Sequence, residues 1–173
     1  VGNANPDFTL GWTNTFSWKG LVLSLLVDGR YGGKVLSQTQ ADMDMYGVTK
    51  VTGDARDRGY VMLEGQKITN VKGFYKSIVG GRAGVTEYYM YDATNFRLRE
   101  LALGYTFPKR WMETTKFFRD IQLAFTARNL FFIYKKAPFD PDLILSTGND
   151  NQAIEVYGMP TTRSMGFSLR VMF

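Results

Sequence analysis

The feature that most constrains the fold is a two-residue alternation of apolar and polar side chains that runs through several long segments. Between Phe8 and Trp18 the even positions are mostly aromatic or aliphatic, whereas the odd positions are Thr, Ser or Gly. Successive side chains of a strand point to opposite faces, so this pattern predicts a β-strand with one apolar face. A short turn at Lys19-Gly20 leads into a second alternating run that ends near Tyr31. The two runs together predict a long hairpin.

The same alternation recurs in three later segments and gives five predicted strands. They cover residues 8–18, 21–31, 94–107, 121–134 and 161–173. In the third of these the apolar positions change parity near Glu100. Either a β-bulge or emergence of the upper part of the strand from an apolar layer explains the change.

The length of these strands favours a membrane-spanning structure. They run for about eleven to fourteen residues, whereas strands of soluble domains have about five or six and a tilted strand crosses a bilayer with about nine to eleven. Short connections also alternate with the long segments 32–93 and 135–160, as periplasmic turns alternate with external loops in outer-membrane barrels. The sequence therefore predicts an all-β chain that forms an antiparallel transmembrane β-barrel segment, with Phe173 at the periplasmic rim.

Aromatic residues make up 15% of the chain, and several fall at predicted strand ends. Such residues form girdles at the two interfaces of a membrane barrel. Trp18, Phe107 and Phe173 fall at the predicted periplasmic ends, and Phe8, Phe131 and Tyr134 at the external ends. The alternative is a soluble sandwich, whose strands also alternate because one face is buried and the other is solvated.

The composition excludes several classes of function. The chain has no Cys and no His, which excludes thiolate and imidazole metal sites, Cys nucleophiles and His-dependent triads. Because no recognisable motif pairs carboxylates for acid–base chemistry, we expect neither an enzyme nor a cofactor. The net charge of +5 comes from scattered basic residues, so we expect no nucleic-acid partner. Neither an apolar run of about 18 residues nor a signal-peptide layout is present, and we expect a fragment of a longer protein.

Several short motifs occur in a fixed order along the chain. They are GNANPDF (2–8), DGRYGGKV (28–35), FRLREL (96–101), LGYTFP (103–108), RNLF (128–131) and FDPD (139–142). This series resembles the C-terminal region of the SusC/RagA family of TonB-dependent outer-membrane transporters. Phe107 departs from it by standing in the usual place of a Leu, and the long segment from Leu36 to Met90 matches only loosely.

The resemblance implies the setting in which the chain works. It implies the last five strands of a barrel of about twenty-two, an internal plug, a TonB box upstream and a SusD-like surface lipoprotein. The implied function is import of oligosaccharides or oligopeptides across the outer membrane of a Gram-negative bacterium. Expected partners are the remainder of the barrel, its plug, the lipoprotein, the TonB complex, the barrel-assembly machinery and outer-membrane lipid. A soluble carbohydrate-binding domain, or a barrel acting as adhesin or enzyme, are the alternatives.

Charged residues on the predicted polar face are the first candidate site. Asp28, Arg30, Arg97 and Arg99 fall near the predicted external strand ends and face the lumen. Buried charges need partners, so contacts with the plug are favoured over contacts with substrate.

The long loops supply two further candidates. Tyr88, Tyr89 and Tyr91 could stack on a sugar or grip a peptide, although an interfacial belt or internal packing is the favoured interpretation. Asp42-Met43-Asp44 and Asn149-Asp150-Asn151 offer oxygen ligands for calcium, but their spacing does not match an EF-hand loop. We therefore expect these acidic segments to be solvated.

The terminal strand is the last candidate. Its apolar face carries Met165, Phe167, Leu169, Val171 and Phe173. This pattern resembles the C-terminal signal that the barrel-assembly machinery recognises, and the same residues would also face lipid.

Overall fold

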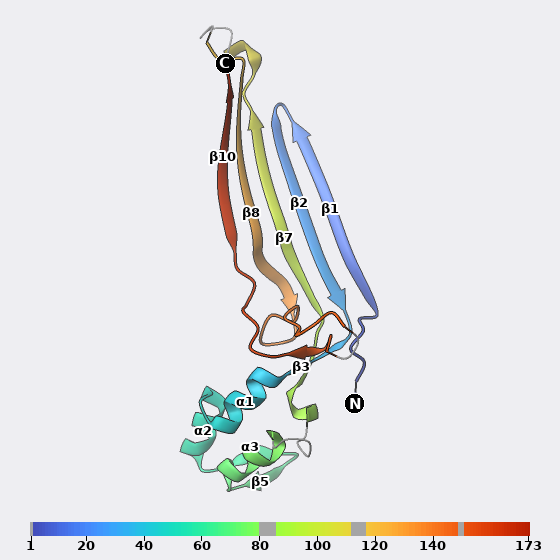
Figure 1. Cartoon of the computed structure of the whole chain (residues 1–173), viewed down its shortest axis with the longest axis vertical. Coiled ribbons are helices and arrows are strands. Elements are labelled where there is room, and N and C mark those ends of the chain that lie inside the picture. The colour runs from blue at the N-terminus through green and yellow to red at the C-terminus, as the bar shows by residue number, and fades with distance from the viewer. Residues whose placement is uncertain (1, 80–85, 112–116, 149–150) are drawn as a thin grey trace. The chain divides into compact units, whose positions relative to one another are not determined.

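The computed structural model describes residues 2–79, 86–111, 117–148 and 151–173, and the chain divides into two compact units (Figure 1). The strand unit consists of Pro6–Gly32, Ala93–Asp140 and Pro160–Phe173. The loop unit consists of Val1–Asn5, Gly33–Asp92 and Pro141–Met159. Each unit is therefore assembled from segments that are distant in the sequence.

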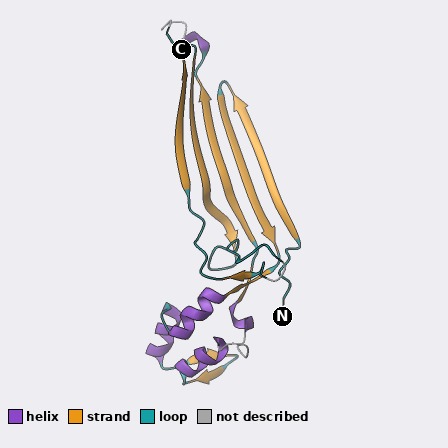
Figure 2. Ribbon diagram, in the orientation of Figure 1, coloured by secondary structure: helices purple, strands orange, loops and turns teal. Residues whose placement is uncertain are grey.

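The strand unit is a five-stranded antiparallel sheet in the order β1-β2-β7-β8-β10 (Figure 2). Its strands are β1 (Phe8–Trp18), β2 (Leu21–Tyr31), β7 (Asn95–Thr106), β8 (Asp120–Lys135) and β10 (Ser164–Met172). The antiparallel β architecture predicted from the alternation is confirmed.

One row of side chains shows how the strands are aligned across the sheet. Phe16 lies opposite Leu23, which lies opposite Leu103. The row continues from Leu103 to Phe125 and from Phe125 to Phe167, with 4.8 Å between the last two ring centroids. Directly opposed residues lie on the same face of a sheet. The apolar positions of all five strands therefore form one continuous face.

A β-bulge explains why the alternation of β7 changes phase. The pairing of β7 with β8 shifts between Leu98 and Glu100, and the pairing with β2 shifts at the same level. Because Arg99 is an extra residue, Leu98 and Leu101 both stay on the apolar face, opposite Val27 and Leu25 respectively. Of the two explanations that the sequence leaves open, the structure shows the bulge.

The hairpin turn between β1 and β2 is set by two residues with left-handed backbone angles. Lys19 has φ 45° and Gly20 has φ 87°. Positive φ at both central residues is the requirement of a tight two-residue hairpin turn whose twist matches its strands. A Cβ atom on Gly20 would also lie 2.5 Å from the Thr106 carbonyl oxygen, so this position needs glycine.

The loop unit contains helices that the alternation did not predict. Its elements are β3 (Lys34–Ser37), α1 (Gln38–Tyr46), α2 (Lys50–Arg58), β4 (Val61–Leu63), β5 (Gln66–Ile68), α3 (Val71–Val79), the 3-10 helix η2 (Thr86–Tyr89), β6 (Met90–Asp92) and β9 (Ile154–Glu155). Strand β3 pairs with β6 and β9, and β4 pairs with β5. Among the described residues, no helix has both the length and the apolar character needed to cross a membrane.

Caps and a small core hold the loop unit together. Ser37 and Thr49 cap α1 and α2 by accepting backbone N–H bonds from Gln40 and Thr52. The buried apolar residues are Ala41, Ala55, Val61, Val71, Phe74, Tyr75, Ile78 and Tyr89. Segments that the sequence analysis treated as long loops thus contain a packed module.

Candidate functional site

A network of charged side chains lies on the polar face of the sheet, beside the bulge. Asp28 lies opposite Arg97 in the pairing of β2 with β7, and the Arg97 Nε lies 3.4 Å from Asp28 Oδ1. Arg99 Nε donates to Asp28 Oδ2 at 2.8 Å, and Arg99 Nη2 contacts the same oxygen. Because these arginines stand two positions apart in one strand, both can reach a single carboxylate on the neighbouring strand.

Arg97 is the buried member of this network. Its side chain is 2% exposed, and its guanidinium carbon lies 5.4 Å from the centre of the Phe132 ring. Phe132 is its neighbour on β8. The guanidinium therefore combines a carboxylate partner with an aromatic face in a place from which water is largely excluded.

Arg30 does not join the same carboxylate. Its Nε donates to the carbonyl oxygen of Ala93 at 3.3 Å. On the far side of the bulge, Arg128 Nε lies 3.1 Å from Glu100 Oε2, and the Arg128 side chain is 62% exposed. This end of the polar face thus holds two groups of ion pairs. The group around Asp28 includes the buried Arg97, whereas the pair of Arg128 with Glu100 is exposed to solvent.

The three loop tyrosines occupy different environments. Tyr89 is 2% exposed, and its hydroxyl donates to Asp44 Oδ2 at 3.2 Å. Burial, followed by the nearby Asp44 carboxylate, raises the pKa of Tyr89. Tyr88 is partly exposed and packs edge-on against Phe74, while Tyr91 lies in β6 opposite Val35. Tyr89 is therefore a core residue that presents no ring face to a ligand.

The expectation that the acidic residues considered for calcium are solvated is wrong for Asp44, which is 3% exposed and hydrogen-bonded within the loop unit. Asp44 accepts from Gln40 Nε2 at 3.0 Å and from Thr49 Oγ1 at 2.6 Å. The Tyr157 hydroxyl donates to Asp42 Oδ2 at 2.6 Å. In the part of the chain that the structure describes, no three acidic side chains gather as a metal site would require. Residues 149 and 150 of the second acidic segment lie outside the described residues.

The terminal strand carries its predicted apolar side chains on the apolar face. Met165, Phe167, Leu169 and Val171 pair with β8 residues of that same face. Phe173 follows β10 and packs its ring against Phe117 and Phe118, with centroid separations of 5.2 and 5.6 Å. The chain end is thus fixed to the β7–β8 connection by aromatic contacts.

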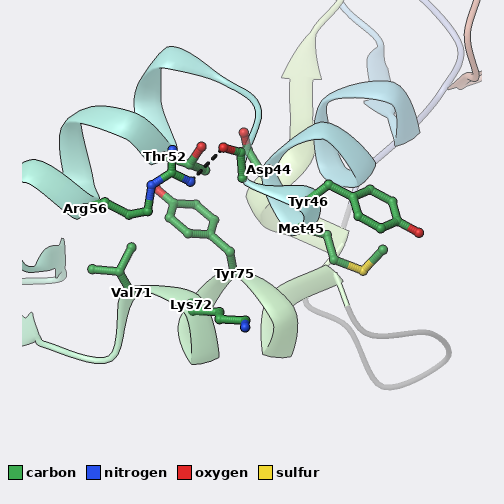
Figure 3. Close-up of a pocket in the computed structure, with 9 residues that line it drawn as sticks. Asp44, Met45, Tyr46, Thr52, Arg56, Val71, Lys72 and Tyr75 are labelled. Atoms are coloured by element: carbon green, nitrogen blue, oxygen red, sulfur yellow. Dashed lines mark hydrogen bonds between the residues drawn. The ribbon is translucent and has the colours of Figure 1, made fainter.

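Sequence reasoning missed two features of the loop unit. Glu155 is buried and accepts bonds from Ser37 Oγ at 2.7 Å and Thr39 Oγ1 at 2.6 Å, which ties β9 to β3 and α1. A pocket between α1, α2 and α3 is the second feature (Figure 3). The alternation reveals neither feature, and the signals that could have indicated the helices are the capping residues, Ser37 and Thr49 at their starts and Gly47 and Gly59 at their ends.

Comparisons with known proteins give consistent relatives. No protein-family model matches the chain. The chain is 23% identical over 178 residues to TonB-dependent receptor P3 of Formosa agariphila, a match that covers 100% of this chain and 17% of the receptor. It is 25% identical over 157 residues to TonB-dependent receptor P39 of the same organism, covering 90% of this chain and 14% of that receptor.

Solved structures show the same fold. The chain aligns with the RagAB peptide importer in the "open-open" state with a TM-score of 0.64 and 17% identity, covering 96% of this chain and 17% of that one. The "closed-closed" state of the same importer gives a TM-score of 0.63 and 16% identity, with the same coverage.

The chain corresponds to only a small part of each relative. The chain spans about a sixth of the relatives' length, since the matches cover 17% and 14% of the two receptors. The two relatives are named as TonB-dependent receptors, and the solved structures are of a peptide importer. The sequence matches are thus to TonB-dependent receptors, and the solved structures show that the chain has the fold of one part of the RagAB importer.

Proposed function

We propose that this chain supplies part of the wall and loops of a TonB-dependent outer-membrane importer of oligosaccharides or oligopeptides. The observation that carries the proposal is the row from Phe16 to Phe167, which makes one face of five long antiparallel strands apolar. The opposite face carries the Asp28, Arg97 and Arg99 network. A barrel wall needs this division, because one face meets lipid and the other meets a polar lumen.

The connections support an orientation for the wall. Strands β1 and β2 are joined by two residues, whereas the loop unit is built mainly from the connection between β2 and β7 and the connection after β8. Short turns are periplasmic and long loops external in barrels of this kind. The proposal therefore places the loop unit outside the cell and Phe173 at the periplasmic rim.

The charged network has a role in this setting. Asp28 and Glu100 face Arg97, Arg99 and Arg128 on the polar side of the sheet, so the arginines outnumber the acids there. A lumen wall of this kind attracts an acidic segment, and the plug that fills the lumen is its nearest partner. We assign these residues to contact with the plug first and with substrate second.

The remaining partners follow from the same proposal. The fold likeness to the RagAB importer supports pairing with a SusD-like surface lipoprotein and energy supply from the TonB complex. The barrel-assembly machinery would recognise the apolar residues of β10, and the same residues would face lipid after assembly.

The experiment that tests the proposal uses the full-length protein in its source cells. An antibody against β10 is used to blot outer-membrane fractions, comparing boiled with unboiled samples, because folded barrels migrate differently until heat unfolds them. A large, heat-modifiable outer-membrane band supports the proposal. Uptake of labelled oligosaccharides and oligopeptides by a strain deleted for the gene then identifies the cargo. A soluble band near the 19.7 kDa of this chain would overturn the proposal.

A further inference from the structure

A pocket of about 200 Å³ lies within the loop unit, between the end of α1, the middle of α2 and the start of α3 (Figure 3). Its lining residues are Asp44, Met45, Tyr46, Gly47, Thr52, Arg56, Val71, Lys72 and Tyr75. Ligand sites for drug-sized molecules hold about 300 to 1,000 Å³, so this pocket fits one small group and not a whole oligomer.

The guanidinium of Arg56 is held in place at the pocket by the end of α1. Gly47 ends that helix with a left-handed φ of 72°, and its carbonyl oxygen accepts from Arg56 Nη1 at 2.7 Å. A Cβ atom on Gly47 would lie 2.5 Å from the same nitrogen, so a larger residue there would displace the guanidinium from this contact. Arginine has five N–H donors, and one bond to a carbonyl leaves others for a ligand.

Two further donors line the pocket. Lys72 is exposed at the start of α3. Tyr75 is 3% exposed and also lines the pocket. Burial, followed by the neighbouring Tyr88 and Asp44, raises the pKa of Tyr75 to about 12. Its hydroxyl therefore keeps its proton at neutral pH and can donate it.

The acceptors of the pocket are already occupied. Asp44 is 3% exposed, and its oxygens receive bonds from Gln40, Thr49 and Tyr89. The Thr52 hydroxyl donates to the Thr49 carbonyl oxygen at 2.9 Å. Among the polar lining residues, the Arg56 guanidinium is therefore the main group left to bind a ligand, and the one carboxylate of the lining is buried.

We infer that this pocket binds a carboxylate group, carried by an acidic sugar or by the C-terminus of a peptide. The inference rests on the proposed function, because the carboxylate would belong to the cargo. A planar carboxylate takes two parallel N–H bonds from a guanidinium. A neutral sugar or a blocked peptide lacks the charge that this set of donors matches.

The test is calorimetric titration of the purified full-length receptor in detergent. The probes are galacturonate and N-acetyl-dialanine, and their neutral counterparts are galactose and the dialanine amide. We expect at least one of the two carboxylates to bind, and its neutral counterpart to bind with much lower affinity. Arg56→Gln should weaken binding about tenfold, since a bond to a charged group contributes at least that factor.

Matched variants on the same helices provide the controls. Lys50→Gln in α2 and Lys76→Gln in α3 remove a charge outside the pocket lining, and both should bind as the unaltered receptor does. Binding of galacturonate alone would assign the pocket to an acidic sugar, and binding of the peptide alone to a peptide terminus. The inference is overturned if neither carboxylate binds, if the neutral probes bind equally, or if the controls lose as much affinity as Arg56→Gln.

Heat-modifiability of the same preparations separates this inference from the proposed function. A heat-modifiable barrel that binds no carboxylate overturns the pocket and leaves the importer standing. A preparation that binds carboxylates but forms no barrel overturns the importer and leaves the pocket standing. Near-ultraviolet circular dichroism of each variant shows whether its loop unit has kept its packing.

Discussion

At the scale of single residues, the Arg97 guanidinium depends on its partners more than any exposed charge of the sheet. It is 2% exposed, whereas the Asp28 carboxylate that it contacts is 25% exposed. Removing one member of a buried ion pair leaves an uncompensated charge in a place that water cannot easily reach. We therefore expect Asp28→Ala to lower the free energy of unfolding of the full-length barrel by about 3 kcal/mol. Denaturant unfolding followed by loss of heat-modifiability measures this.

The control for that prediction is the open pair on the same face. Arg128 is 62% exposed and Glu100 is 35% exposed, so solvent screens their attraction. Glu100→Ala should cost less than about 1 kcal/mol. Equal losses for the two variants would show that burial does not govern the strength of these ion pairs.

The buried tyrosines give the loop unit a response to alkaline pH. Burial, followed by Tyr88 and Asp44, raises the pKa of Tyr75 from 10.0 to about 12, and burial raises the pKa of Tyr89 as well. Between these pH values the unfolded chain has lost protons that the folded chain keeps. The stabilisation is therefore fully present below pH 10 and is lost as pH rises through about 12.

Hydrogen exchange of the full-length receptor at increasing pH tests this response. Protection of α1 and α3 should fall between about pH 10 and 12, while the sheet strands keep theirs. Tyr75→Phe removes one titrating group and should make the fall shallower. Equal loss of protection in both units would contradict the prediction.

At the scale of elements, the bulged pairing of β7 with β8 is accommodated by one left-handed residue. Asn129 has φ 52°, and its Nδ2 donates to the Thr162 carbonyl oxygen at 3.2 Å. A β-branched side chain in this conformation clashes with its own backbone, at a cost of about 1 to 2 kcal/mol. Asn129→Val should therefore lower the free energy of unfolding by that amount in the full-length barrel.

Two variants separate backbone strain from loss of the amide. Thr126→Val places the same side chain at a regular position of β8, where β-branched residues are favoured, and should be nearly neutral. Asn129→Gly keeps the left-handed angle and should cost less than Asn129→Val. If glycine and valine cost the same at Asn129, the amide bond to Thr162 matters and the backbone angle does not.

How far the sequence predicts each element depends on what stabilises it. The long strands are encoded by alternation, which is why the apolar row through Leu103 and Phe125 can be anticipated. The bulge at Arg99 leaves the same parity change as a strand that leaves the membrane, so sequence alone gives two explanations. Helix α1, with the sequence QTQADMDMY, shows little apolar periodicity. Its position depends on the local Ser37 cap and on the bond from Tyr89 to Asp44, which links residues distant in sequence.

The same distinction applies to the candidate site. Asp28 and Arg97 fall on one predicted face, and alternation is enough to bring them together. Arg30 shares that face, but its bond to the Ala93 carbonyl depends on where the chain returns after the loop unit. The pocket at Arg56 needs three helices and a left-handed Gly47, none of which a two-residue period reveals.

At the scale of the whole molecule, the proposed wall requires that its two faces respond differently to charge. Phe167 is 80% exposed on the apolar face, and Ser168 lies on the other face opposite Ala124. In a membrane barrel, arginine at a lipid-facing position near the midplane costs about 2 to 4 kcal/mol, whereas a lumen position is far more tolerant. Phe167→Arg should thus reduce insertion and stability of the full-length barrel, and Ser168→Arg should change either much less.

Both variants alter adjacent positions of one strand and add one charge, and they place that charge on opposite faces of the sheet. The yield of heat-modifiable protein in the outer membrane measures insertion, and denaturant unfolding in lipid vesicles measures stability. A soluble sandwich would bury the face of Phe167 in a core, so Phe167→Arg would also damage that fold. It would then lower the yield of soluble protein, whereas a barrel wall loses protein from the outer membrane. Equal tolerance of the two variants would contradict both architectures and the face assignment itself.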